Sequence, residues 1–115
     1  MMHPQYRSDL LKMADIFKAL GDPNRLRILS LISHQELCVC EITSILDISQ
    51  SNASQHLARL RSVDLVKERR QAQWIYYSLN PEAFPLIAEI QRYLPDVSDD
   101  LKKIENLTSH PNCKL

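Results

Sequence analysis

Residues 47–61, DISQSNASQHLARLR, combine a turn, a helix cap and a helix with two different faces. The first three residues predict a turn, and Ser49 suits the N-cap of a helix over about 50–63. Apolar residues recur at helical spacing on one face, namely Ala53, Leu57 and Leu60. The opposite face is rich in Ser, Asn, Gln and His, whose donors and acceptors suit base edges and phosphates. We therefore predict a recognition helix, although an exposed helix is also polar without binding DNA.

Three further helices are predicted upstream. The first covers about 8–20 and the second ends near residue 33. Between them, in LGDPNR, Gly21 suits the end of a helix, Asp22 suits an N-cap and Pro23 suits the first position of the next helix. A short third helix covers about 39–46. On the first helix, apolar residues recur at helical spacing at Leu10, Met13, Phe17 and Leu20. The second helix is expected to bury Leu26, Leu29 and Ile32 or their neighbours.

Downstream, the pattern changes to strands. LVKER at 65–69 and WIYYSL at 74–79 are rich in β-branched and aromatic residues and predict a hairpin. Because the intervening residues lack Gly or Asn-Gly, we expect a longer, mobile loop between the strands. Asn80 and Pro81 then suit the cap and start of another helix, Pro95 interrupts it, and a second segment is expected over 96–107.

This order of elements predicts a mainly α fold with a β-hairpin wing, a winged helix-turn-helix. We expect one domain over 1–107, with the recognition helix at 49–63 and the wing at 65–79, followed by a flexible tail at 108–115.

The chain has 115 residues, 44% of them hydrophobic, and no apolar run approaches the roughly 20 residues of a membrane span. With no secretory signal at its start, we expect a cytoplasmic protein that does not interact with membranes and whose thiols stay reduced.

The charge distribution favours a nucleic-acid partner, although formal net charge is zero. Residues 50–77 carry five basic and two acidic residues, a net of +3, whereas 82–105 carry three basic and six acidic residues, a net of −3. A local basic surface attracts phosphates, but two unevenly charged solvated faces would look the same. The predicted DNA contacts are Gln50, Ser51, Asn52, Ser54, Gln55, His56 and Arg59 on the helix, with Arg69 and Arg70 on the wing.

Two of the three cysteines, Cys38 and Cys40, lie one residue apart in ELCVCEI. Positions i and i+2 of a regular helix point about 200° apart, so both thiols cannot hold one ion from within a helix. Either Cys38 precedes the helix or binding distorts the first turn. The helix N-terminus lowers thiol pKa values, whereas the nearby Glu36 and Glu41 oppose this, and the sequence leaves the balance open. Simple packing of the cysteines, or a Cys-X-Cys disulfide, is the alternative to ion binding.

Four motifs together resemble the ArsR/SmtB family of metal-responsive bacterial repressors: ALGDPNRLRIL, ELCVCEI, SQSNASQHLARLR and WIYYSL. The resemblance implies a homodimeric repressor, paired through its first and last helices, that leaves double-stranded operator DNA when an inducer binds. The cysteine doublet most resembles arsenic-responsive members, which implies As(III) or Sb(III) as inducer and arsenical resistance as the setting. No cofactor is implied.

Two departures from the family pattern matter. Thr43 stands where arsenic-responsive members commonly have a third cysteine, and Ala72 stands where the wing turn often has Gly. Three thiolates suit trivalent arsenic, so the third metal ligand could be Cys113, the Thr43 hydroxyl, water or a small thiol. We expect chelation to deform residues 38–42 and to misplace residues 49–61 on DNA.

Other functions remain as alternatives. A cadmium, lead or thiol-redox sensor of the same family would use the same doublet. Neither the N-terminal cysteines of cadmium/lead relatives nor the last-helix histidines of zinc relatives are present, which favours arsenite or antimonite. A thiol enzyme or metal carrier is a further class, but no acid, base or nucleophile constellation indicates an enzyme.

Overall fold

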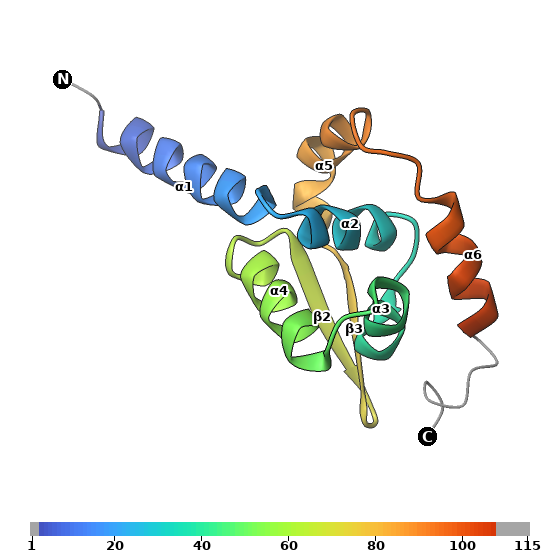
Figure 1. Cartoon of the computed structure of the whole chain (residues 1–115). Coiled ribbons are helices and arrows are strands. Elements are labelled where there is room, and N and C mark those ends of the chain that lie inside the picture. Colours follow the sequence, from blue (N-terminus) through green and yellow to red (C-terminus); the bar gives the residue numbers. More distant parts are fainter. Residues whose placement is uncertain (1–2, 108–115) are drawn as a thin grey trace.

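The computed structural model describes residues 3–107 of the chain. Figure 1 shows a long N-terminal helix that projects from a body of shorter helices around a small sheet. In chain order the elements are α1 (Pro4–Leu20), α2 (Pro23–Ile32), β1 (Leu37–Cys38), α3 (Val39–Leu46), α4 (Gln50–Ser62), β2 (Val66–Gln71), β3 (Trp74–Leu79), the 3-10 helix η1 (Pro81–Ala83), α5 (Phe84–Gln91) and α6 (Ser98–Leu107). The predicted winged helix-turn-helix order is confirmed.

The joint between α1 and α2 forms as its sequence predicts. Asp22 is the N-cap of α2, and its Oδ1 accepts hydrogen bonds from the backbone N–H groups of Asn24 at 2.8 Å and Arg25 at 3.1 Å. Helix α1 starts earlier than expected because the His3 side chain caps it, accepting from Gln5 N at 3.1 Å, with Pro4 at the first helical position. Both helix starts therefore follow from local capping.

The core lies between α2, α3, α4 and the sheet. Its fully buried side chains include Ile28, Leu29, Leu31, Leu37, Ile42, Leu57, Leu60, Leu65 and Ile87. Of the four apolar positions at helical spacing on α1, Leu10, Met13 and Phe17 are exposed and Leu20 is buried. The three exposed residues belong to α1, the helix that projects from the body in Figure 1.

The sheet has three strands in the order β1-β3-β2, all antiparallel. The expectation of a longer wing loop is wrong, because β2 ends at Gln71 and β3 begins at Trp74. Ala72 adopts φ 54°, the left-handed conformation that lets the chain reverse within two residues. Strand β1, which the sequence did not predict, pairs Leu37 with Tyr77 and Cys38 with Tyr76.

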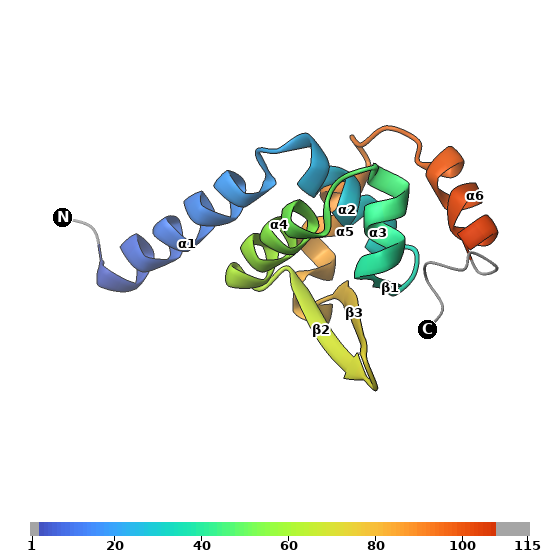
Figure 2. The same cartoon turned by 60° about the horizontal axis from the view of Figure 1, so that its bottom comes forward.

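The C-terminal part returns to the helical body. The helix expected from Pro81 starts as the short η1 and continues as α5, and α6 begins at Ser98, after the break at Pro95. Helix α6 packs against α3 and buries Ile104. In Figure 2, α6 stands on the far side of the body from the projecting α1.

An arginine of α2 connects α6 with the body. Arg27 of α2 donates to both carboxylate oxygens of Asp100, at 2.7 and 2.6 Å, and to the carbonyl oxygen of Ile45 at 3.2 Å. One guanidinium therefore joins three helices, since Ile45 lies on α3 and Asp100 on α6. Within residues 3–107, no helix has the length and apolar character needed to cross a membrane.

Candidate nucleic-acid interface and thiol site

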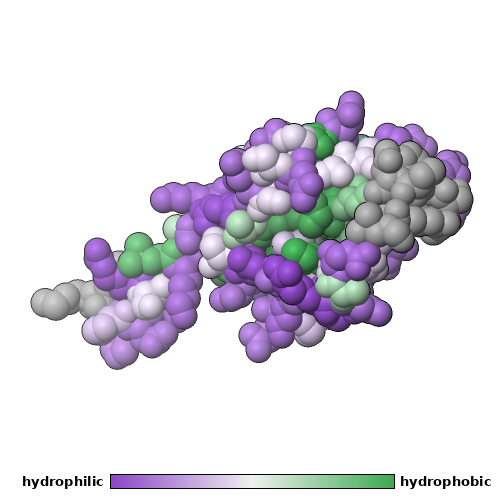
Figure 3. Space-filling view, turned by 90° about the horizontal axis from the view of Figure 1, so that it is seen from below, coloured by the Kyte–Doolittle hydropathy of each residue, from purple (hydrophilic) through white to green (hydrophobic). Residues whose placement is uncertain are grey.

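Helix α4 presents a polar face to solvent. Ser49 caps it, with Ser49 Oγ accepting from Asn52 N at 3.1 Å, and the helix buries Ala53, Leu57 and Leu60 against the core. Five of the seven contact residues predicted on this helix are exposed, namely Gln50, Ser51, Asn52, Ser54 and Gln55. In Figure 1 the N-terminal end of α4 and the tip of the wing project toward the same side. Viewed from that side, the surface is mostly hydrophilic, with hydrophobic residues near its middle and on the α1 arm (Figure 3).

His56 does not share this exposed face. Its side chain is 18% exposed, and Nδ1 lies 3.2 Å from Arg25 Nη1 and 3.9 Å from Asp22 Oδ1. The ring thus packs against the joint between α1 and α2, whose conformation Asp22 already fixes. This geometry favours a structural role for His56 over contact with a base.

Arg59 also turns toward the N-terminal helix. Its Nη2 lies 2.8 Å from Asp15 Oδ1 on α1, an ion pair that lowers the Asp15 pKa through the hydrogen bond from Arg59. Arg61, which was not among the predicted contacts, pairs with Glu68 of β2 at 2.6 Å. The two arginines near the end of α4 therefore connect the helix to its neighbours, one to α1 and the other to the wing.

The two predicted wing arginines have different surroundings. Arg69 donates to both oxygens of Glu36, at 2.5 and 3.2 Å, and its guanidinium lies 4.6 Å from the centre of the Tyr76 ring. Arg70 is exposed and pairs in register with Ile75, so it points to the other face of the hairpin. The sequence did not reveal Glu36 as a partner of Arg69, because 33 residues separate the two in the chain.

The two thiol residues lie on either side of a boundary between strand and helix. Cys38 ends β1 and is the N-cap of α3, with extended backbone angles of φ −85° and ψ 162°, whereas Cys40 lies in the first turn of the helix. The Cys38 backbone N–H donates to Glu41 Oε1 at 2.9 Å, and the Thr43 hydroxyl donates to the Cys40 carbonyl oxygen at 2.8 Å. Of the two alternatives left by the sequence, the first is therefore correct: Cys38 precedes the helix.

The environment of Cys38 raises its pKa. Burial of the thiol is the largest cause, and the Glu41 carboxylate acts in the same direction, while hydrogen bonds from the backbone N–H groups of Glu41 and Cys40 lower the pKa by less. Glu36 instead faces Arg69, whose hydrogen bond lowers the Glu36 pKa. The balance that the sequence left open is thus decided for Cys38, which is a free, buried thiol.

A pocket of about 460 Å³ opens beside the two cysteines. Its walls come from the first turns of α3, the start of α4 and the beginning of β3, and they consist of Cys38, Val39, Cys40, Thr43, Ser44, Gln50, Gln73, Trp74 and Ile75. The pocket therefore joins the thiols, the recognition helix and the wing. Gln50 belongs both to this wall and to the exposed face of α4.

The described residues do not supply a third protein ligand for a metal ion. Within residues 3–107, no group of three or more His, Cys, Asp or Glu side chains is arranged to hold a metal. Cys113, the predicted third ligand, lies outside the described residues. Among the described residues, Cys38 and Cys40 line one pocket, and Cys38 is the one of the two that is a free thiol.

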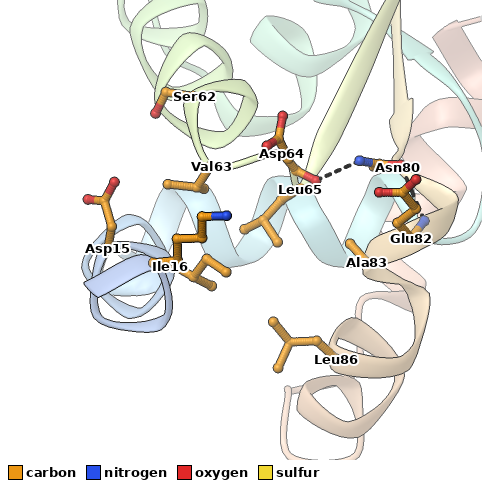
Figure 4. A pocket seen from close by; sticks show the side chains of 11 residues that line it. Asp15, Ile16, Ser62, Val63, Asp64, Leu65, Asn80, Glu82, Ala83 and Leu86 are labelled. Atoms are coloured by element: carbon orange, nitrogen blue, oxygen red, sulfur yellow. Dashed lines mark hydrogen bonds between the residues drawn. The ribbon is translucent and has the colours of Figure 1, made fainter. Parts of the chain in front are cut away.

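A second pocket, of about 410 Å³, lies between α1, the α4–β2 joint and α5 (Figure 4). Asp15, Asp64 and Glu82 are among its lining residues, but Asp15 is already paired with Arg59. Asn80 crosses the joint by donating to the Asp64 carbonyl oxygen at 2.9 Å. This pocket is a gap where three elements meet. Its carboxylates are not grouped in a way that could hold a metal ion, as judged from the described residues.

Comparison with known proteins gives consistent matches. The profile of the family described as "bacterial regulatory protein, arsR family" matches residues 22–68. The chain is 41% identical over 103 residues to the arsenic resistance transcriptional regulator ArsR2 of Pseudomonas putida, covering 84% of this chain and 90% of that protein.

Two solved structures are similar over most of the chain. Reduced HlyU from Vibrio cholerae has a TM-score of 0.71 at 35% identity, covering 82% of this chain and 100% of that one. The homodimeric winged helix-turn-helix DNA-binding domain of Mb0332 from Mycobacterium bovis has a TM-score of 0.73 at 30% identity, covering 87% and 90%.

Proposed function

Because the chain belongs to the arsR family of bacterial regulatory proteins, we propose that it is a cytoplasmic, homodimeric repressor released from operator DNA by trivalent arsenic or antimony. As a DNA-binding regulator it is not an enzyme. The observation that carries the proposal is the position of Cys38 and Cys40. They lie at the junction of the strand that pairs with the wing and the helix that packs against α4.

DNA binding rests on α4 and the wing. The exposed amides and hydroxyls of Gln50, Asn52 and Gln55, with Ser51 and Ser54, would read base edges or phosphates in the major groove. Arg70 is exposed on the wing and would contact the phosphate backbone. Arg59, Arg69 and His56 would reach DNA only after leaving their partners within the chain.

The family resemblance implies pairing through the first and last helices, but at the C-terminal end the exposed large apolar side chains of the described residues lie on or beside α5 and not on α6, so we propose pairing through α1 and α5. Large apolar side chains stay exposed there: Tyr6, Leu10, Leu11, Met13 and Phe17 on α1, Phe84 on α5 and Tyr93 just after it. A single chain leaves this surface in water, and a second copy would bury it. A two-fold dimer places two α4 helices in successive major grooves, so we expect an inverted-repeat operator.

Release would follow from the geometry of the thiols. To hold one ion, the sulfurs of Cys38 and Cys40 must turn toward each other, although the first lies at the N-cap and the second inside the helix. That movement disturbs the contacts of Cys38 with the backbone N–H groups of Cys40 and Glu41. We expect residues 38–42 to deform and to displace α4 through α3.

The strand offers a second path to the DNA-binding elements. Cys38 pairs with Tyr76 of β3, so a shift of Cys38 acts on the wing without passing through α3. Both DNA-binding elements would therefore respond to one chelation event. Soft trivalent arsenic and antimony suit thiolate ligands, which is why we favour them as inducers.

A cadmium, lead or thiol-redox response is the second candidate. It is supported by the similarity to HlyU, whose structure was determined in a form described as reduced. Burial and the raised pKa of Cys38 argue against oxidation at that residue, because oxidants attack exposed thiolates.

Fluorescence anisotropy tests the proposal. A labelled duplex from the region upstream of the protein's own gene would be bound at several salt concentrations and then titrated with arsenite, antimonite, cadmium or zinc. We expect salt-dependent binding, release by arsenite, and loss of that release in Cys38→Ser and Cys40→Ser. Ser44→Ala, at another position on the pocket wall, is the matched control and should respond like the wild type.

If only cadmium or an oxidant released the protein from the duplex, the second candidate function would replace the first. Failure to bind any duplex specifically would contradict the repressor itself.

A further inference from the structure

We propose that Asp15 and Glu68 are specificity determinants of DNA binding, because they neutralise Arg59 and Arg61 at the end of α4 that does not read bases. This inference rests on the proposed function and adds to it two carboxylates that restrict how the protein binds DNA. It depends on the two ion pairs, on their place along α4 and on the difference between specific and non-specific binding.

Both arginines lie at the C-terminal end of α4 and face carboxylates from neighbouring elements. Nη2 of Arg59 lies 2.8 Å from Asp15 Oδ1 on α1, and Nη1 of Arg61 lies 2.6 Å from Glu68 Oε2 on β2. In Figure 1 this end of α4 lies beside α1 and at the base of the wing, away from the wing tip. The two carboxylates therefore come from the two elements that flank this end of the helix.

The residues proposed to read bases lie at the other end of α4. Residues 50–55 form most of its exposed polar face, and the recognition helix of a helix-turn-helix presents its N-terminal residues to base edges. At 1.5 Å per residue, Arg59 and Arg61 lie about 14 and 17 Å farther along the helix axis than Gln50. Phosphate contacts of these two arginines would therefore not depend on the bases that the N-terminal end meets.

Further hydrogen bonds support both ion pairs. Glu68 Oε2 also accepts from the Tyr77 hydroxyl at 3.2 Å, and Tyr77 is buried on the neighbouring strand β3. Arg59 also donates to the Ser62 hydroxyl at 3.2 Å. These contacts favour the paired arrangement over a guanidinium that moves freely toward a phosphate.

The two modes of DNA binding respond differently to a free cation. Non-specific binding comes almost entirely from the neutralisation of phosphates by Lys and Arg, so an additional free arginine strengthens it on any sequence. Specific binding adds hydrogen bonds to base edges, which form only when the N-terminal end of α4 lies in the major groove. Exposed ion pairs add little to folding stability, so the main effect of these two carboxylates is expected on DNA binding.

Fluorescence anisotropy with two duplexes tests the inference. One duplex comes from the region upstream of the protein's own gene, and the other has a random sequence. In Asp15→Asn/Glu68→Gln, we expect affinity for the random duplex to rise about tenfold or more near 0.1 M salt, with a plot of log affinity against log salt that is steeper by about two units. Affinity for the upstream duplex should change by less than about threefold, so the specificity ratio falls.

The control removes the same number of negative charges elsewhere. Glu89→Gln/Asp99→Asn alters exposed carboxylates on α5 and α6 and should leave both affinities close to those of the wild type. Glu68→Gln alone repeats the test without a change in α1, the helix through which we propose that two chains pair. It should make the salt plot for the random duplex steeper by about one unit.

Arginine variants separate neutralisation of the cations from positioning of α4. Arg59→Gln/Arg61→Gln breaks the same ion pairs but also removes the cations, so its affinity for the random duplex should stay near that of the wild type. If the ion pairs served only to position α4, the carboxylate variants and the arginine variants would both weaken binding to the upstream duplex, and the inference would be wrong.

An equal rise in the control variant, or an equal rise for both duplexes, would also overturn the inference while leaving the repressor intact. A wild type that binds the upstream duplex no better than the random duplex would instead refute the proposed function.

Discussion

Glu36 holds the guanidinium of Arg69 through two hydrogen bonds, and Glu36 lies only two residues before Cys38. The wing is therefore tied to the thiol segment twice, once by backbone pairing between Cys38 and Tyr76 and once by this ion pair. In this arrangement Arg69 neutralises a carboxylate of its own chain instead of a phosphate of DNA.

Replacing that carboxylate should strengthen DNA binding. In Glu36→Gln, Arg69 loses its ionic partner and becomes available to a phosphate, so we expect operator affinity to rise several-fold. The plot of log affinity against log salt should become steeper by about one unit for each added phosphate contact. Anisotropy titrations over a range of salt concentrations measure both effects.

Glu89→Gln serves as the control, because it removes the same charge from an exposed position on α5. An equal gain in both variants would mean that net charge, and not the release of Arg69, governs affinity.

The inducers should differ in their dependence on pH. The raised pKa of Cys38 keeps its thiol protonated at neutral pH. Binding of Cd²⁺ displaces thiol protons, so its affinity should rise by about tenfold per pH unit for each displaced proton. Neutral arsenous acid exchanges hydroxyl groups for thiols and releases water, so its affinity should stay nearly constant between pH 6 and 8 while its rate of binding increases with the thiolate fraction.

Competition titrations would measure how the affinities for Cd²⁺ and arsenite depend on pH. Stopped-flow absorbance would measure the rate of arsenite binding over the same pH range. A steep pH dependence of the arsenite affinity would show that the bound species is not formed by the proposed exchange.

The ion pair between Arg27 and Asp100 should add to the free energy of unfolding at neutral pH and lose this effect at acidic pH. Arg27 lowers the pKa of Asp100 through its hydrogen bonds, so the contribution is present above the ordinary carboxyl pKa and is lost as pH falls through the lowered value. Asp100→Asn should lower the free energy of unfolding by about 1–3 kcal/mol at pH 7, and the loss should shrink in acid.

Denaturant unfolding at pH 7 and near pH 3 would measure this, with Asp99→Asn as the control that removes a neighbouring exposed carboxylate. Equal stability of the two variants at pH 7 would mean that Arg27 does not secure α6.

Glycine should be the better residue at the wing turn. Ala72 has φ 54°, where a Cβ costs about 1–2 kcal/mol, whereas Gly adopts this conformation freely. After the greater flexibility of Gly in the unfolded chain is subtracted, Ala72→Gly should raise the free energy of unfolding by up to about 1 kcal/mol.

Ala58→Gly makes the same exchange at an exposed position inside α4, where it should lower stability by about 1 kcal/mol. Thermal melts of both variants give the comparison, and destabilisation by both would contradict the strain at Ala72.

Local signals explain what the sequence predicted well. The bounds of α3 and the start of α4 agree with expectation because their caps and breaks lie within a few residues of the helix itself. The capping hydrogen bond of Ser49 at the start of α4 goes to Asn52, only three residues away, so it is a local interaction. The same is true of Asp22 and Pro23 at the start of α2.

Features that depend on distant residues could not be predicted in this way. Strand β1 has only two residues, and it exists because β3 pairs with it. The ion pairs of Arg59 and Arg69 join segments 44 and 33 residues apart, and for this reason two predicted DNA contacts are engaged within the chain. The tight wing turn depends on Ala72 accepting a conformation that its residue type disfavours.

Gln50 is the first residue of α4 and also part of the pocket wall beside Cys38 and Cys40. In the proposed function, this side chain therefore belongs both to the surface that reads DNA and to the wall of the inducer pocket. A substitution of Gln50 that changes the preferred base would, under this proposal, also change the shape of the pocket beside the cysteines. The preference for an operator sequence and the preference for an inducer would therefore change together when Gln50 is replaced. Biosensors engineered from this protein would need to optimise both preferences at the same time.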